Sequence, residues 1–185
     1  MERKRNDPNE IIVEDDICRM KLYNNKCEEV AETIFDLKYK SEIEKYKWHL
    51  QKGYVATDWF DENDKHVQMC LHQAIIQISG QEVPEGYEID HKDTIKLNNL
   101  EENLRVCTRY QNQHNRTKQR NNTSGYKGIT WQEQSKKWRA QIRVNNKKIF
   151  LGLFEKDLDA AQAYNNAALQ YHGEFAQINP ISTGV

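Results

Sequence analysis

The stretch EIDHKDTIKLNNLEENLRVCTRYQN, residues 88–112, decides the fold in the middle of this 185-residue chain. Residues 87–91 alternate apolar and polar side chains as a short strand does, and residues 104–108 are a second strand. Residues 92–103 between them form a polar, Asn-rich loop. From Thr108, an expected N-cap, the chain runs to residue 120 without Gly or Pro, which is typical of a helix. The predicted order is strand, loop, strand, helix.

Two polar residues, Asp90 and His91, stand side by side at the end of the first of these strands. Hydrolysis of a phosphodiester needs a base to activate water, a cation to neutralise charge, and ligands to hold that cation. A His can accept a proton near neutral pH, and an Asp carboxylate is a hard oxygen ligand that suits Mg²⁺. Neighbours on a strand point to opposite faces, so we expect the pair to serve cation and water separately only if the backbone bends there.

Two asparagines follow, twelve residues after His91 and nine residues further on. Asn103 comes at the entry to the second strand, where its amide is expected to tie the long loop together and to orient His91. Asn112 comes in the first turns of the predicted helix. If that helix packs across the two strands, Asn112 lies opposite Asp90 as a second metal ligand. Asp93 and Asn99 are interpreted as loop formers.

These residues resemble the HNH nuclease motif, the ββα-metal fold, in its variant with Asn in place of the last His. The match begins at LHQAI, residues 71–75, and covers about residues 66–120. The resemblance implies that His91 is the general base and Asn103 the structural Asn of the catalytic site. It implies that Asp90 and Asn112 hold one Mg²⁺ or Mn²⁺ ion, and that cleavage leaves 5′-phosphate ends.

Two further histidines are weaker candidates. His72, in LHQAI, stands where the family commonly has a His, and the sequence is as compatible with a structural role as with a catalytic one. His114 is an alternative ligand to Asn112. Two residues along a helix span about 200° of rotation, so only one of these two can face the site, and we choose Asn112.

The formal net charge of −1 hides a strongly basic segment. Residues 108–156 carry twelve Lys and Arg against two Asp and Glu. Such an excess favours a surface that binds a polyanion, although a solvated basic surface is the alternative. At the tail of the predicted helix, phosphate contacts are expected for Arg116, Lys118 and Arg120.

Beyond a linker at residues 121–125, three strands and an Ala-rich helix capped by Asp157 are predicted. Asn145-Asn146 is expected to be a two-residue hairpin turn. Alternation places Trp138 with its apolar neighbours against the helix, and Trp131 is also interpreted as core. The opposite face is predicted to enter a DNA groove and contact bases and phosphates. The DNA-contacting residues predicted in this region are Lys127, Thr130, Gln132, Arg139, Gln141, Arg143, Lys148 and Phe150.

This C-terminal segment resembles the Apetala-type DNA-binding domain of plant ethylene-response factors over about residues 122–179, through the closing GEFAQIN. Thr130 and Gln132 stand where Arg is usual in the plant domains, so their base specificity is not expected to carry over. Outside plants the domain is commonly joined to HNH homing endonucleases, and the two resemblances therefore support each other.

The predicted class is α+β. A small α+β scaffold at residues 1–65 is expected to precede the nuclease module at 66–120, and a three-stranded antiparallel sheet packed on one helix follows at 126–180. No secretory signal or membrane span is visible, which favours an intracellular protein in the cytoplasm of a phage-infected or bacterial cell. The four cysteines are scattered, so we expect buried thiols and no structural zinc.

The sequence therefore predicts a metal-dependent, site-specific DNA endonuclease, of the homing class and of phage or mobile-intron origin. Its partner is double-stranded DNA, and both a monomer and a homodimer are compatible with one motif per chain. The alternative is a sequence-specific DNA-binding regulator with an inactive nuclease module. Against it, Asp90, His91, Asn103 and Asn112 are all present.

Overall fold

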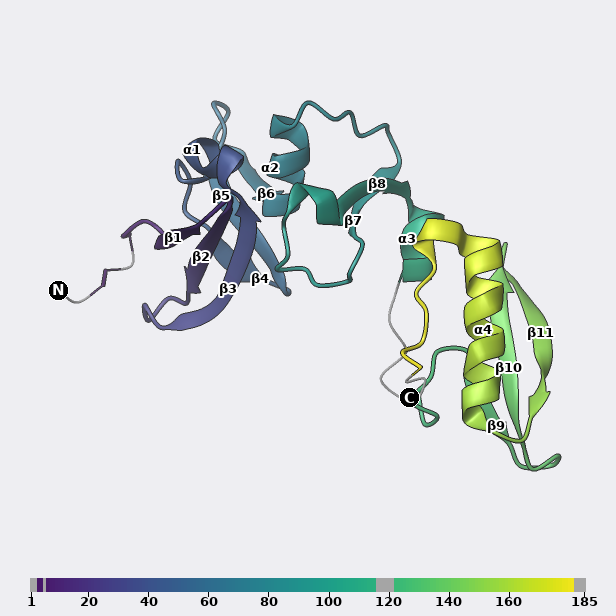
Figure 1. Ribbon diagram of the computed structural model, residues 1–185. Helices are drawn as coiled ribbons and strands as arrows, with labels where there is room; N and C mark the ends of the chain where they lie inside the picture. The colour runs from purple at the N-terminus through teal and green to yellow at the C-terminus, as the bar shows by residue number, and fades with distance from the viewer. Residues whose placement is uncertain (1–2, 5, 116–121, 182–185) are drawn as a thin grey trace. The chain divides into compact units, whose positions relative to one another are not determined.

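The computed structural model describes residues 3–4, 6–115 and 122–181 and divides the chain into two compact units, 1–108 and 109–185 (Figure 1). Helices and strands are mixed along the chain, which confirms the α+β class. The division falls after Thr108, so the helix that follows the strand at residues 104–108 is grouped with the C-terminal strands. Of the helices in the described ranges, none has the length and apolar content needed to cross a bilayer.

The first unit is built from antiparallel sheets. Two have three strands each, with strand order following the chain, and the third is a two-stranded ladder. The strands are β1(Ile11–Glu14), β2(Ile17–Tyr23), β3(Glu29–Asp36), β4(His49–Gln51), β5(Tyr54–Phe60), β6(His66–Cys70), β7(Tyr87–His91) and β8(Leu104–Thr108). The helical segments are η1(Leu37–Tyr39), α1(Lys40–Ile43), α2(Leu71–Ile78) and η2(Glu101–Asn103).

The core of this unit holds α2 in place. Alternate residues of β2 are fully buried, as expected of a strand with one face against a core. Trp48 is 1% exposed, and its indole N–H donates to the carbonyl of Ile43 at 2.8 Å. Leu71 and Ile75 of α2 are completely buried in the same cluster. The helix is therefore fixed by apolar packing, and the side chains at its N-terminal end are fixed with it.

The polar loop of residues 92–103 is fastened to β3. The amide of Ile34 donates to the carbonyl of Leu97 at 3.0 Å, and the amide of Asn99 donates to the carbonyl of Ile34 at 2.9 Å. Ile34 and Asn98 thereby form a parallel bridge. The N-terminal sheet thus supports the loop that follows Asp90 and His91.

The second unit contains the predicted C-terminal sheet and its helix. The strands lie in the order β11-β10-β9 and are antiparallel. Helix α4 lies along the sheet (Figure 1), and Ala160, Ala161 and Ala168 are fully buried where the two pack together. The elements are α3(Arg109–Asn115), β9(Ile129–Gln132), β10(Lys137–Val144), β11(Lys147–Phe154), α4(Asp157–His172) and η3(Gly173–Phe175).

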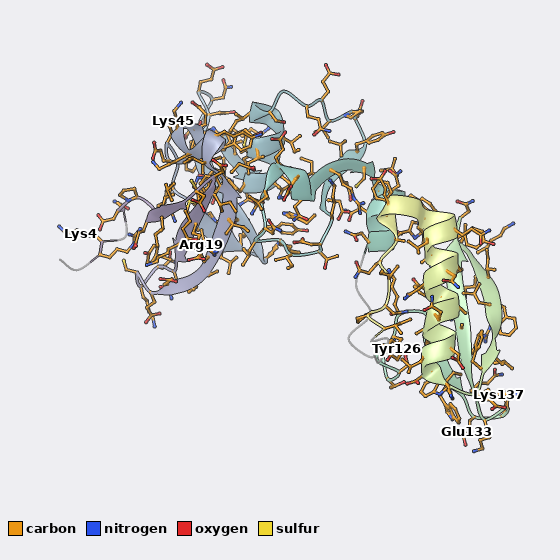
Figure 2. All side chains as sticks on the ribbon, viewed as in Figure 1. Lys4, Arg19, Lys45, Tyr126, Glu133 and Lys137 are labelled. Atoms are coloured by element: carbon orange, nitrogen blue, oxygen red, sulfur yellow. The ribbon has the colours of Figure 1, made fainter. Side chains whose placement is uncertain are left out.

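Local details of this unit test three predictions. The Asn145-Asn146 turn is confirmed, with positive φ of 49° and 63° at its two residues, as a type I′ hairpin requires. At the other end of β10, Lys137 lies beside the β9–β10 turn (Figure 2). The predicted cap at Asp157 is wrong, because α4 begins at that residue and the N-cap position is Lys156, without a side-chain bond. The prediction that Trp131 belongs to the core is also wrong, since this residue is 43% exposed on the edge strand β9.

Candidate nuclease site

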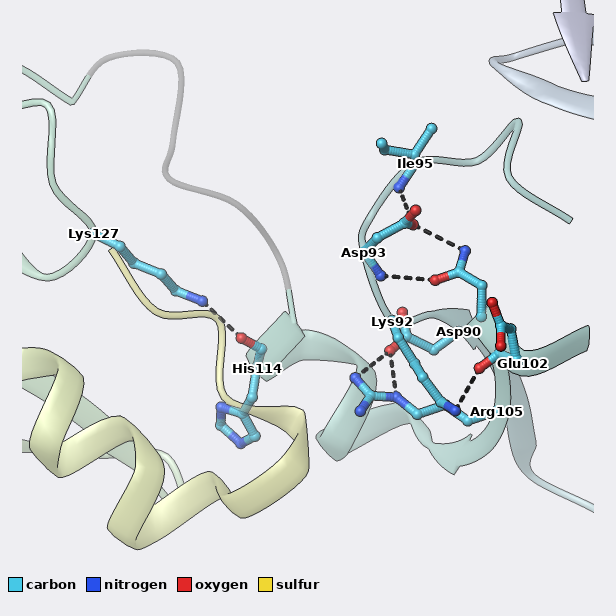
Figure 3. A network of polar contacts seen from close by, with 9 residues as sticks. Asp90, Lys92, Asp93, Ile95, Glu102, Arg105, His114 and Lys127 are labelled. Carbon is cyan, nitrogen blue, oxygen red and sulfur yellow. Dashed lines mark hydrogen bonds and ion pairs between the residues drawn. The ribbon is translucent and has the colours of Figure 1, made fainter. Parts of the chain in front are cut away.

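Asp90 lies on β7 and is paired with Arg105 on β8. The two residues face each other in the antiparallel register, so their side chains share one face of the ladder. Oδ2 of Asp90 accepts from Nε of Arg105 at 3.0 Å and from Nη2 at 2.8 Å (Figure 3). Both side chains are more than nine-tenths buried. The carboxylate is therefore held in one orientation by a charged, two-bond contact.

His91 leaves the same strand on the other face. The ladder keeps one register as far as His91 opposite Leu104, a core residue, and the chain turns directly afterwards. His91 is 5% exposed, and burial lowers the pKa of its imidazole, while a hydrogen bond with Asn99 opposes that shift. Strand alternation, without a bend inside the ladder, thus gives Asp90 and His91 different neighbours.

The imidazole of His72, at the start of α2, lies edge-on to that of His91. Their ring centroids are 5.1 Å apart and the ring planes meet at 74°. Burial and, secondarily, the nearby His91 lower the pKa of His72 to about 3. His72 is therefore neutral at physiological pH. The sequence is compatible with a structural and with a catalytic role of His72. The structure places its ring beside that of His91, the predicted general base.

An aromatic ring and a cation border this His pair. The ring of Tyr54, on β5, lies 5.4 Å from His72 and 6.2 Å from His91, measured between centroids. Nζ of Lys96 lies 3.9 Å from the Tyr54 centroid, a cation–π distance. The described part of the first unit thus gathers two imidazoles, a phenol and an exposed ammonium at the end of β7, while the Asp90 carboxylate lies on the other face of the strand.

Asn103 ties the polar loop together, as the sequence predicts. Its Nδ2 donates to Oδ1 of Asp93 at 3.0 Å and to the carbonyl of Asn98 at 2.8 Å, and its Oδ1 accepts from the amide of Asp93 at 3.1 Å. Figure 3 shows Asp93 at the centre of this network, where it also accepts from the amide of Ile95. Asp93 is confirmed as a loop former. The catalytic importance of Asn103 stays a prediction.

Asn99 is one of the site residues whose role sequence reasoning missed, together with Arg105, Tyr54 and Lys96. The sequence favours a loop former at Asn99, yet the side chain is 1% exposed and its Oδ1 lies 3.3 Å from Nε2 of His91. A hydrogen bond to His91 therefore comes from Asn99, where the sequence predicted Asn103. The only sequence signal was a second Asn in the Asn98-Asn99 pair, which a turn explains equally well.

The second predicted metal ligand, Asn112, lies half-buried in α3 of the second unit. Its position opposite Asp90 stays a prediction. His114, on the same helix, stacks on His172 with centroids 3.7 Å apart, so its ring is engaged inside the second unit. Within residues 3–4, 6–115 and 122–181, no three His, Cys, Asp or Glu side chains are grouped as a metal site.

The thiols of Cys18 and Cys107 are buried, and those of Cys27 and Cys70 are half-buried.

The outer face of the C-terminal sheet carries the predicted DNA contacts. Arg139 pairs with Thr130, and Arg143 pairs with Lys148, so these four side chains share the face opposite α4. All four are exposed. Phe150 is 56% exposed on the same face, with the guanidinium of Arg139 5.7 Å from its ring centroid. The half-buried Gln132 and Gln141 complete the face.

The other predicted DNA contacts differ in position. Nζ of Lys127 donates to the carbonyl of His114 at 2.7 Å (Figure 3), and burial lowers the pKa of its ammonium to about 8. Lys127 is thus occupied by a contact within the second unit, and DNA contact by it stays a prediction. Arg116, Lys118 and Arg120 lie outside the described residues.

Comparison with known proteins identifies the middle of the chain. Residues 71–114 match the family model described as HNH endonuclease. The chain is 31% identical over 140 residues to an uncharacterized HNH endonuclease of Acanthamoeba polyphaga mimivirus, covering 75% of this chain and 70% of the relative. It is 30% identical over 107 residues to Protein 3.8 of Escherichia phage T7, covering 57% of this chain and 87% of the relative. No solved structure matches the chain significantly.

A different kind of relative matches a shorter segment. The chain is 35% identical over 60 residues to APETALA2-like protein 2 of Oryza sativa. The aligned segment covers 32% of this chain and 14% of the relative. That match is partial and leaves the Apetala-type assignment a prediction. The family model and the two long viral matches do establish the nuclease assignment: the chain belongs to the HNH endonuclease family.

Proposed function

We propose that this chain is a metal-dependent, site-specific DNA endonuclease of the homing class, which acts in an infected host cell. The observation that carries the proposal is the end of β7, where a buried carboxylate and a buried imidazole leave adjacent residues toward different partners. Membership of the HNH family supports DNA as the substrate. The viral origin of the relatives supports action during infection.

His91 is proposed as the general base. Burial lowers the pKa of its imidazole, so the ring is neutral at cellular pH and able to take a proton from water. The proton leaves water as its oxygen attacks the phosphorus in line, and the 3′ oxygen departs, which leaves a 5′-phosphate end. In this proposal the phosphate binds beside neutral His72 and the ammonium of Lys96, which both contact the ring of Tyr54 next to His91.

The family generally depends on a divalent cation. Asp90 and Asn112 supply the hard oxygen donors that Mg²⁺ or Mn²⁺ prefers, and in our proposal these two residues hold one ion. A bound ion would neutralise the charge that develops on the phosphate and on the leaving oxygen. The fit is one of donor chemistry, since an Asp carboxylate and an Asn amide both offer hard oxygen ligands, and two bonds from Arg105 hold the Asp90 carboxylate in place. Arg105 orients that carboxylate from the opposite strand.

Site recognition is assigned to the C-terminal sheet. The exposed face with Arg139, Arg143 and Lys148 has the charge to bind phosphates, and Arg and Gln side chains discriminate bases in the major groove. The partial similarity to an Apetala-type protein supports this assignment. In this proposal the first unit cuts and the second unit recognises.

The test is cleavage of supercoiled plasmids that carry phage and host fragments, with the full chain and either Mg²⁺ or Mn²⁺. We expect metal-dependent nicking by the wild-type protein, and a rate lower by about 10²- to 10⁴-fold in His91→Ala, because a general base contributes that much. His66→Ala is the matched control, since His66 is an exposed His on β6 outside the site. If wild type and His91→Ala leave the plasmids equally intact with every metal, the regulator alternative replaces the nuclease.

A further inference from the structure

A chain of hydrogen bonds joins the N-terminal sheet to His91 through the amide of Asn99. Nδ2 of Asn99 lies 2.9 Å from Oγ1 of Thr33 on β3, and Oδ1 lies 3.3 Å from Nε2 of His91. Thr33 and Asn99 are each 1% exposed. Because water is excluded from both side chains, these bonds decide how the amide is oriented.

The direction of each bond follows from the donors available. The hydroxyl of Thr33 has one hydrogen, which it donates to the carbonyl of Leu97 at 2.8 Å. Thr33 must therefore accept from Asn99. The carbonyl of Lys96, 3.3 Å from Nδ2 of Asn99, is also only an acceptor. The NH₂ group of Asn99 thus belongs on this side, which leaves its carbonyl oxygen on the side of His91.

A carbonyl oxygen can only accept, so the hydrogen between Asn99 and His91 sits on Nε2 of His91. A neutral imidazole with hydrogen on Nε2 has its lone pair on Nδ1. Tautomers of a free imidazole interconvert readily, and only one of them presents a given nitrogen as the base. The bond to Asn99 therefore selects which nitrogen accepts a proton.

We propose that Asn99 is a positioning residue that, held by Thr33, fixes the Nε2–H tautomer of His91 and makes Nδ1 the proton acceptor. This inference rests on the proposed role of His91 as general base. It assigns the N-terminal sheet a part in catalysis, because Thr33 on β3 sets the direction of an amide that lies 66 residues later in the sequence.

The tautomer can be measured without activity. In ¹⁵N NMR of the full chain labelled at His, the nitrogen that bears hydrogen resonates far upfield of the bare one, and His91→Gln assigns the signals. We expect a pure Nε2–H form in the wild type and in Thr33→Ser. A mixture of tautomers is expected in Asn99→Ala and, to a lesser degree, in Thr33→Val, which keeps the shape of Thr33 and removes its hydroxyl.

Kinetics supply the second readout. Asn99→Ala should lower kcat by about 10- to 100-fold, the effect of losing a group that orients a functional His, with little change in KM. Thr33→Val should also lower kcat, and Thr33→Ser, which keeps the hydroxyl, should have the kcat of the wild type. Asn98→Ala is the matched control from the same loop, since the Asn98 side chain bonds to Asp93 and not to His91.

The outcomes separate this inference from the proposed function. A wild-type His91 with hydrogen on Nδ1, or an unchanged tautomer and kcat in Asn99→Ala, overturns the role of Asn99 even if His91→Ala is inactive. Another outcome is a pure Nε2–H tautomer in the wild type that becomes a mixture in Asn99→Ala, while the protein cleaves no DNA under any condition. That result sustains the positioning role of Asn99 and overturns the proposed nuclease function. Equal losses of kcat in Asn98→Ala and Asn99→Ala would show that Asn99 only packs the loop and does not position His91.

Discussion

At the scale of single residues, burial makes the charges around β7 energetically important. Asp90 and Arg105 are each more than nine-tenths buried, so neither can exchange its partner for bulk water. Removal of one member of a buried ion pair leaves the other charge desolvated, which costs more than the pair itself contributes. The same residues are thus required for the stability of the ladder and for the orientation of a proposed metal ligand.

Replacement of Arg105 by Leu should therefore destabilise the β7–β8 ladder. We expect the opening free energy of its amides, from hydrogen exchange, to fall by about 3 kcal/mol, because the Asp90 carboxylate loses its buried partner. Arg19→Leu is the matched control, since Arg19 pairs with Glu14 and Glu32 on an exposed strand face. It should leave the exchange of β7 and β8 almost unchanged. An equally small effect of Arg105→Leu would show that the stability of the ladder does not depend on this ion pair.

At the scale of the element, local patterns in the sequence were sufficient for the β7–β8 ladder, for β10 and for its turn, although they placed the cap of α4 one residue too late. The alternation of β10 correctly predicted which side chains face α4, since a strand has a two-residue period. The Asn145-Asn146 turn was predictable because few residues adopt positive φ at low cost. The β7 and β8 strands followed from the same local patterns.

The contacts that the sequence did not reveal are long-range. The Asn99 amide meets Thr33 across 66 positions, and nothing in a run of loop formers indicates that the loop docks on β3. His72 is likewise positioned by the apolar packing of α2, whose depth in the core a helical pattern alone cannot give. Candidate residues can thus be found by motif, while their hydrogen-bond partners depend on tertiary packing.

Gly128, at the start of the C-terminal sheet, provides a test of sheet–helix packing. Its φ is +78°, and a Cβ atom there would lie 2.3 Å from the ring of Tyr164 on α4 and 2.6 Å from the carbonyl of Gln141. Gly128→Ala therefore adds a clash of about 1–3 kcal/mol to the backbone strain of about 1–2 kcal/mol. We expect amides of α4 to exchange correspondingly faster.

Gly125→Ala is the control that isolates the clash. Gly125 has a φ of +80°, and nothing lies within 4 Å of an added Cβ, so only the backbone strain remains. The difference between the two variants measures the packing of β9 against α4. Equal destabilisation by both would mean that Tyr164 moves aside freely and that the sheet and helix are loosely packed.

At the scale of the whole molecule, charge is divided along the chain in a way that suits two tasks. The formal net charge is −1, yet residues 108–156 carry twelve basic residues against two acidic ones. A local basic surface binds DNA through counterion release, while a nearly neutral total limits attraction elsewhere. The division of labour proposed above makes a quantitative prediction about salt.

The triple variant Arg139→Ala, Arg143→Ala and Lys148→Ala should weaken DNA binding and lower its salt dependence. The plot of log K against log salt has a negative slope, whose magnitude decreases by about 0.9 for each phosphate that the protein no longer neutralises, so three such phosphates would decrease it by about 2.7. Matched removal of charge at Lys26, Lys45 and Lys65, exposed in the first unit, should leave the slope unchanged. At protein concentrations that saturate the DNA, the sheet variant should still nick, with relaxed site preference, since the proposed catalytic residues are intact. Unaltered slope and site preference would place recognition outside this sheet face.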